Sequence, residues 1–236
     1  MFGRISALAV AAAVLSASPA LAFTQDAPTS YLGQNTAAVL SKGVSYVSAS
    51  GPGNSINYAT AMGGGELGLG LGGAFALAGG LGTGINLAGA YKYPLSRMGS
   101  MAASVAVNTA LNGIGAAMAV GGLGVAVPLT WDMGSAMVSV SPNFRAPALL
   151  NPMNNATVGA DVGVQYPVSP AWSVLGTIMP SYAMTGGAIA APIMLGARLS
   201  PSSTAHVDFN LANVTVAPAT GLTVGTIAVT GHVGWR

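Results

Sequence analysis

Charged side chains are scarce in this 236-residue sequence: seven lysines and arginines and five acidic residues make up 5% of it. Soluble domains carry about 25% charged residues, so an ordinary solvated surface is excluded. The formal net charge of only +2 leaves no basic surface to neutralise phosphates, and nucleic acid is not expected as a partner. Cysteine is absent, which excludes disulfides, thiolate metal sites and a thiol nucleophile.

Long blocks of large hydrophobic residues are also missing, although hydrophobic residues make up 52% of the chain. The apolar run of residues 5–15 is shorter than the roughly 20 residues that a membrane helix needs. It follows a basic start at Arg4 and precedes the small-residue sequence Ala20-Leu21-Ala22. We therefore expect residues 1–22 to be a cleaved signal peptide that exports the protein.

The sequence does contain a repeated hairpin pattern. An alternating run, a glycine step, a proline-containing turn and a second alternating run recur four times. The glycines lie 33 to 39 residues apart, at Gly89, Gly124, Gly163 and Gly196. This interval fits two strands of about ten residues, one tight turn and one longer loop. Because proline lacks an amide N–H, the pattern predicts that the prolines lie in the turns.

Alternation of apolar and polar residues within these segments predicts β-strands, because successive side chains of a strand point to opposite faces. In residues 204–211, Val207 and Phe209 share one face, and His206 and Asp208 lie on the other. Most charged residues of the expected strands fall on this second face. The pattern therefore predicts a sheet with one apolar and one more polar surface.

The strand count predicts an all-β fold, an up-and-down antiparallel transmembrane β-barrel. One strand at about 66–78, eight in the four hairpins and a last one at about 222–235 give ten strands, an even number as a closed membrane barrel requires. Twelve is the alternative, because residues 39–60 could add a hairpin. The expected organisation is a signal peptide (1–22), an N-terminal segment (23–65) that is periplasmic, a lumenal plug or an extra hairpin, and the barrel (66–236).

The end of the chain carries a further signal. Val229, Val233 and Trp235 alternate with small or polar residues, and Arg236 follows the tryptophan. With the leader, this pattern makes residues 66–236 resemble the bacterial outer-membrane β-barrel class, small and porin-like, whose last strand ends in an aromatic residue. The resemblance implies an outer-membrane location, lipid around the barrel and the barrel-assembly machinery as a partner, and it singles out no particular family.

Aromatic residues indicate the direction of the barrel, because they lie at or beside the short turns or the chain end. Tryptophan and tyrosine in outer-membrane barrels mark the two membrane interfaces, and short turns are typical of the periplasmic side. The longer link at residues 145–156 is then expected to face outward. Six residues make up the expected interfacial girdle: Tyr91, Tyr93, Trp131, Tyr166, Trp172 and Trp235.

The expected inward face is rich in glycine and alanine, which occupy little volume. Small barrels are normally filled by their own side chains, so this pattern predicts room in the lumen. We expect a structural protein or a passive pore for small solutes; an outer-membrane lipid-modifying enzyme and an envelope scaffold or adhesin are the alternatives, and the oligomeric state stays open. The small inward residues are Gly68, Gly70, Gly72, Ala74, Ala88, Ala90, Gly122, Gly124 and Ala126.

One polar group is expected on the lumen wall: Arg198, His206, Asp208 and His232, from the last three strands. A His/Asp group can act as a general base, which is the basis of the enzyme alternative. The nearby serines lie in a turn at the rim, so an ion-pair network that stiffens the barrel or tunes ion selectivity is favoured. We expect no catalytic residue, cofactor or metal site.

Two other fold classes fit parts of the pattern. Residues 98–131 carry no charge, which would suit a helical membrane protein, but asparagines, Pro128 and the hairpin period disfavour it. A secreted β-protein with one buried face would alternate in the same way. Its solvated face would be too poor in charge for good solubility.

Overall fold

The computed structural model describes residues 24–25, 28–32, 34–51, 55–73, 84–114, 117–148, 156–217, 221–225 and 227–236. The predicted signal peptide, Ala74 and residues 149–155 of the longer link lie outside these described residues. Every element assigned within them is a β-strand. Among the described residues, no helix is long and apolar enough to cross a membrane.

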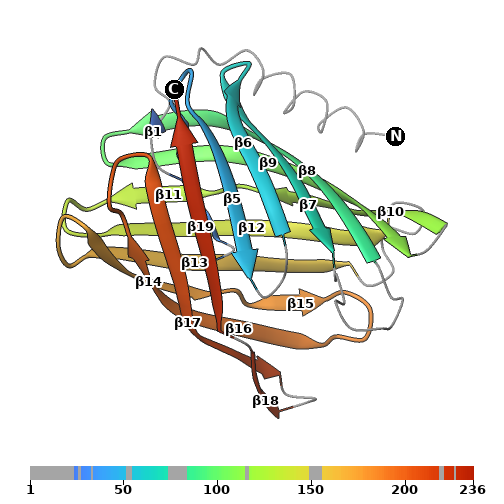
Figure 1. The fold of residues 1–236 in the computed structure, drawn as a ribbon. Coiled ribbons are helices and arrows are strands. Elements are labelled where there is room, and N and C mark those ends of the chain that lie inside the picture. The colour runs from blue at the N-terminus through green and yellow to red at the C-terminus, as the bar shows by residue number, and fades with distance from the viewer. Residues whose placement is uncertain are drawn as a thin grey trace.

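Twelve antiparallel strands form one closed barrel (Figure 1). Three of the twelve are built from two segments that pair with a common neighbour, namely β10 with β11, β14 with β15, and β18 with β19. Their bounds are β5 (Ser45–Gly51), β6 (Ser55–Met62), β7 (Gly65–Gly73), β8 (Gly84–Met98), β9 (Met101–Ile114), β10 (Ala117–Ala126), β11 (Leu129–Asp132), β12 (Met137–Ala148), β13 (Thr157–Pro167), β14 (Trp172–Ile178), β15 (Ser181–Ala183), β16 (Ile189–Leu199), β17 (Ala205–Ala217), β18 (Gly221–Val224) and β19 (Ala228–Trp235).

The barrel closes between its first and last strands. β19 pairs with β5, with Val233 opposite Val47, and the two strands lie side by side in red and blue in Figure 1. β5 also pairs with β6, and β6 with β7, so residues 45–62 add a hairpin to the ten strands counted from the repeats. The all-β antiparallel barrel is therefore confirmed, with the alternative count of twelve strands in place of ten.

Two of the prolines expected in turns lie within the wall instead. Pro128 separates β10 from β11, and both segments pair with β9 and β12, so one barrel strand is interrupted without changing direction. Pro94 lies inside β8, beside an irregularity in its pairing with β9. A proline cannot donate to the ladder but fits where the ladder is already broken. The hairpin period alone did not reveal these breaks.

The distribution of apolar and polar side chains is the reverse of that in a soluble protein. Large apolar residues on the outer face are exposed, such as Leu69 at 51%, Leu195 at 54% and Val233 at 61%. Polar residues on the inner face are buried, such as Ser139 at 0% and Asp161 at 6%. An apolar outside and a polar inside are what a barrel surrounded by lipid requires.

One end of the barrel carries short turns. They are residues 63–64, 99–100, 133–136, 168–171 and 200–204, and the start of β5 and the end of β19 lie at the same end. In the first turn Gly63 and Gly64 have φ of 58° and 81°, the positive values that a tight two-residue hairpin turn needs at both positions. The two longest connections, residues 74–83 and 149–156, belong to the opposite end.

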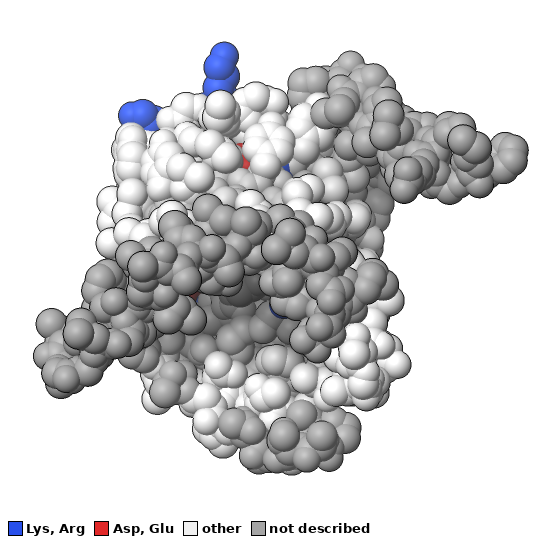
Figure 2. Space-filling view, turned by 90° about the vertical axis from the view of Figure 1, so that its right-hand side faces the viewer, with Lys and Arg blue, Asp and Glu red and all other residues white. Residues whose placement is uncertain are grey.

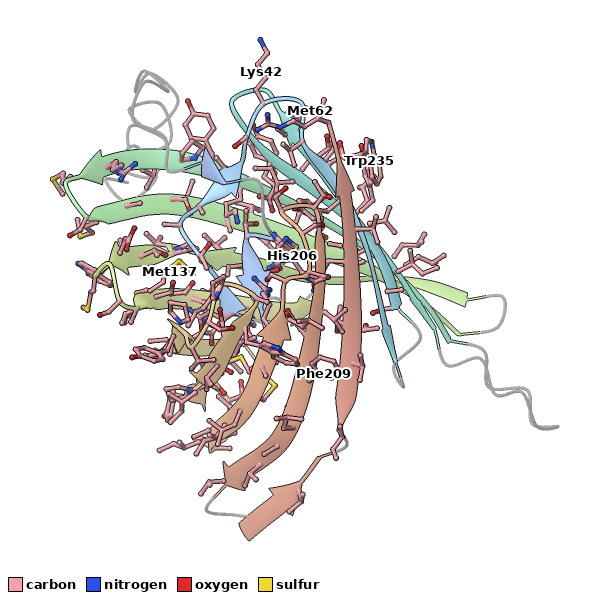
Figure 3. All side chains as sticks on the ribbon, turned by 60° about the vertical axis from the view of Figure 1, so that its left-hand side comes forward. Lys42, Met62, Met137, His206, Phe209 and Trp235 are labelled. Atoms are coloured by element: carbon pink, nitrogen blue, oxygen red, sulfur yellow. The ribbon has the colours of Figure 1, made fainter. Side chains whose placement is uncertain are left out.

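The described residues between 28 and 40 lie inside the barrel. They contain β2 (Ser30–Tyr31), β3 (Gln34–Asn35) and β4 (Val39–Leu40); β2 pairs with β3, and β4 pairs in parallel with β1 (Thr24–Gln25). Figure 3 shows these strands, in pale blue, between the walls. We call residues 28–40 the lumenal segment.

Candidate functional site in the lumen

The sequence-predicted polar group comes from three adjacent strands, β16, β17 and β19. Arg198 lies opposite Asp208 in the ladder and donates to it twice, from Nε at 2.6 Å and from Nη2 at 2.7 Å. The Nε2 atom of His232 lies 3.2 Å from the Oδ2 atom of Asp208. Arg198 and Asp208 are both almost fully buried. The structure thus brings three of the four residues into one ion-pair group.

This ion-pair group also contacts the lumenal segment. Nη2 of Arg198 donates a hydrogen bond to the backbone oxygen of Ser30 at 3.0 Å. Because Asp208 holds the guanidinium from the other side, the arginine is fixed between the wall and the segment. The group therefore positions the segment, a contact that the sequence did not indicate.

His206 lies beside this group but bonds elsewhere. Its Nδ1 atom is 2.9 Å from the hydroxyl of Ser200, and its Nε2 atom is 3.3 Å from the backbone oxygen of Ser203. The ring also packs against Tyr46, with centroids 6.0 Å apart. Figure 3 shows His206 on the inner side of the wall. Since Asp208 bonds to Arg198 and His232, no Ser–His–Asp relay forms around His206, and the geometry does not favour the enzyme alternative.

A second ion pair, not singled out from the sequence, lies across the β7–β8 ladder. Glu66 and Lys92 are directly opposite, with Nζ 3.6 Å from Oε2, and both side chains are largely buried. The Glu66 carboxylate accepts a hydrogen bond from the Thr29 hydroxyl at 2.7 Å and another from the backbone N–H of Leu40 at 3.1 Å. Alternation places both residues on the inward face, but β7 and β8 are joined by residues 74–83 and not by a short turn that would set their register, so the sequence alone did not show this pair.

The lumenal segment also contacts the wall opposite Glu66. The side-chain amide of Gln34 donates to the backbone oxygens of Ser139 and Asp161, at 3.5 and 3.4 Å. The backbone N–H of Ala37 donates to the Thr130 hydroxyl at 2.8 Å. Asp161 forms a third ion pair, with Arg145 at 2.9 Å. Hydrogen bonds from several strands therefore hold the segment across the lumen.

An apolar cluster lies between the lumenal segment and the short-turn end. It consists of Leu40, Val44 and Tyr46, packed against two alanines of β6. Tyr46 stands opposite Gly234 in the ladder, and a Cβ atom at Gly234 would come within 2.6 Å of the tyrosine ring. Glycine at this position is what allows the ring to lie flat against the wall. Lys42 lies between Leu40 and Val44 in the sequence and at the end of the barrel in Figure 3.

A cavity of about 280 Å³ lies between the segment and the barrel wall, and Leu40 and Tyr46 of the apolar cluster also border it. Its wall is formed mainly by β5 to β9 and includes several of the small inward residues expected from the sequence. Small and polar residues of the wall include Ser48, Asn57, Ala59, Gly68, Gly70, Ala88, Ala90 and Asn108, and the segment contributes Ser30 and Asn35; larger side chains such as Leu40, Tyr46 and Tyr58 border the cavity as well. The small side chains leave the room that the sequence pattern suggested.

The six residues of the expected girdle all lie in strands, in the parts of those strands that are near the short turns. Trp172 stacks on Phe209 with centroids 6.1 Å apart, and Trp235 stacks on Tyr58 at 6.2 Å. The Tyr91 hydroxyl donates to the backbone oxygens of Met62, at the end of β6, and of Gly63, in the turn that follows it. Tyr166, Trp172 and Trp235 are 41% to 50% exposed, and Trp235 points outward in Figure 3. The two stacking partners were not included in the expected girdle.

The fold and the lumen define a class: a closed antiparallel barrel with an apolar outer face, a polar interior and a lumenal segment. No protein-family model matches the sequence, and no curated protein matches it. Among solved structures, the KdgM porin is similar at a TM-score of 0.50 and 8% identity, over 82% of this chain and 98% of that chain. At this identity the likeness concerns the fold, and the chain has the fold of an outer-membrane β-barrel porin.

Two further structures show weaker likeness. The NanC porin matches at a TM-score of 0.47 and 8% identity, over 81% of this chain and 97% of that chain. The anion-selective porin from Comamonas acidovorans matches at a TM-score of 0.37 and 17% identity, over 77% of this chain. This chain spans only 58% of the length of that porin.

Proposed function

We propose that this protein is an outer-membrane pore for small solutes whose lumen is narrowed by the segment of residues 28–40. The observation that carries the proposal is the cavity of about 280 Å³ left between this segment and the glycine- and alanine-lined wall. A structural barrel needs no such space, because side chains of ordinary size would fill it.

The outer face supports a location in the membrane. A spanning structure must satisfy its backbone hydrogen bonds internally, and a closed barrel does so because it has no free edge. The ladder between β19 and β5 supplies this closure. Export through cleavage of residues 1–22, lipid around the apolar face and the barrel-assembly machinery as a partner belong to the same proposal. An N-terminal sequence beginning at Phe23 in the membrane fraction would test the cleavage.

The lumenal contents support a small conductance. Val44 and Tyr46 occupy the lumen toward the short-turn end together with Leu40, the last residue of the segment, and the rest of the segment crosses the lumen. Solutes that cross the barrel must pass beside these groups or wait for them to move. We therefore expect a narrow pore that excludes large solutes.

Conductance in planar bilayers tests this function. The native protein should give small unitary currents, and deletion of residues 28–40 should increase them several-fold, because the barrel wall remains while the segment that crosses the lumen is removed. A heat-dependent shift in gel mobility checks that each barrel is folded. If both folded proteins fail to conduct, the pore function is wrong; equal currents from both would show that the segment does not narrow the pore.

A further inference from the structure

Three asparagine side chains border the cavity without a protein partner. Neither Asn57 nor Asn108 makes a side-chain hydrogen bond to any described residue, and the same is true of the Asn35 side chain on the lumenal segment. Each amide offers two N–H donors and one carbonyl acceptor. Part of the cavity lining therefore consists of groups that can both donate and accept hydrogen bonds and that the described residues leave available.

Neighbouring glycines leave the space that two of these amides occupy. A Cβ atom at Gly70 would lie 2.7 Å from Oδ1 of Asn57, and a Cβ atom at Gly124 would collide with the side chain of Asn108. In each case the glycine on the neighbouring strand has no Cβ atom, so the asparagine side chain can occupy that space. The wall thus has a shape in which the amides lie against the barrel and a solute can pass in front of them.

The charges near the cavity are already compensated. Among the described residues, the lysines, arginines and carboxylates on the inner face form three pairs: Glu66 with Lys92, Asp161 with Arg145, and Asp208 with Arg198. Glu66 and His232, which line the cavity, bond to Thr29 and Asp208 respectively. Figure 2 shows a hollow in the face it presents and few charged side chains among the described residues there.

We infer that the cavity accepts small, neutral, hydroxyl-rich solutes, such as polyols and monosaccharides, in preference to ions; this inference rests on the proposed pore. A hydroxyl group both donates and accepts hydrogen bonds, as the amides do. In the cavity a solute hydroxyl can therefore exchange its hydrogen bonds to water for hydrogen bonds to the amides. An ion would give up hydration without meeting an unpaired opposite charge, which is costly in a lumen surrounded by lipid. The cavity volume of about 280 Å³ is many times what a single water needs, and it leaves room for a small sugar.

Solute entry into proteoliposomes tests the inference with three probes of similar size: glucose, gluconate and glucosamine. Glucose should enter about fivefold faster than either ion, the difference expected for about one net hydrogen bond. Equal or faster entry of gluconate or glucosamine would overturn the inference while leaving the pore intact. If no probe enters and no ion current is measured, the pore function itself fails, and the inference fails with it.

Variants of the two wall amides locate the effect. Asn57→Leu and Asn108→Leu keep the approximate size of the side chain and remove its hydrogen bonds, so glucose entry should fall about fivefold for each. Potassium chloride conductance should change much less, because leucine does not narrow the passage greatly. Thr109→Val is the matched control: it is adjacent to Asn108, exposed on the outer face, and should change neither measurement. Unchanged glucose entry in both folded asparagine variants would overturn the inference, and the wild-type probe series decides it if a variant does not fold.

Discussion

The hydroxyl of Thr29 lies 2.7 Å from both carboxylate oxygens of Glu66, and this bond joins the lumenal segment to the barrel wall. The same carboxylate accepts the backbone N–H of Leu40, so a single acidic residue holds both ends of the segment. Lys92 supports Glu66 from the neighbouring strand. The Glu66–Lys92 pair of the β7–β8 ladder is therefore one of the wall sites that hold the segment, together with Thr130 and Arg198.

Replacing Thr29 by valine should loosen the segment without unfolding the barrel. The substitution keeps the side-chain shape and removes a hydrogen bond to a charged group, an interaction worth about 1.5–3 kcal/mol. We expect faster chymotrypsin cleavage at Tyr31 and larger unitary currents than in the wild type. Thr109→Val, on the outer face, serves as the control. Wild-type cleavage rates and currents in Thr29→Val would show that the bond between Thr29 and Glu66 does not retain the segment.

Asp208→Asn should destabilise the barrel and change ion selectivity. The variant leaves the buried Arg198 without its anionic partner, so the free energy of unfolding should fall by about 1–3 kcal/mol. The uncompensated positive charge should make the pore more favourable to anions. Urea titration and reversal potentials measure the two effects.

Asp132→Asn is the matched control for this change. Asp132 is exposed at the end of β11 and accepts one hydrogen bond, from the backbone N–H of Gly134 at 2.9 Å. Its substitution should alter stability by no more than about 0.5 kcal/mol. If Asp208→Asn behaves like this control in stability and in selectivity, the ion-pair group has neither of the roles assigned to it.

Deletion of residues 233–236 should prevent assembly. It removes the ladder positions that join β19 to β5 at Val47, Tyr46 and Ser45, and it leaves an open edge in hydrocarbon where no water can satisfy the backbone. Membrane fractionation and heat-dependent gel mobility report the loss. Deletion of Arg236 alone, which lies beyond β19, should be tolerated. A heat-shifting barrel from the longer deletion would contradict the role of the last strand.

The orientation of the barrel can be tested with two inserted tags. A tag within residues 149–155 should bind antibody on intact cells, because the longest connections of outer-membrane barrels face outward. A tag in the turn at residues 99–100 should bind only after the outer membrane is breached. Binding with the opposite preference would reverse the orientation, and equal protection of both tags in whole cells would indicate a periplasmic protein.

The amino-acid sequence by itself determined which face of each strand a side chain occupies. Asp208 and His206 lie inward and Phe209 lies outward as the alternation predicts, because a period of two is a local property of an extended chain. For the same reason the inward glycines and alanines were visible before any strand had a partner. The sequence did not reveal which inward groups would bond. His206 and Asp208 lie side by side on one strand, yet His206 bonds to the turn at residues 200–204 and Asp208 bonds to Arg198 and His232 on the two neighbouring strands.

Only the tertiary structure decided the strand count, the partners and the contents of the lumen. β5 joins the barrel because the last strand of the chain lies beside it, a contact between opposite ends of the sequence. The position of residues 28–40 depends on Glu66, Thr130 and Arg198, which come from three separate strands and converge only when the barrel closes. Alternation is read along a single strand, whereas these contacts form across strands, and their hydrogen bonds exist only after the distant segments have met.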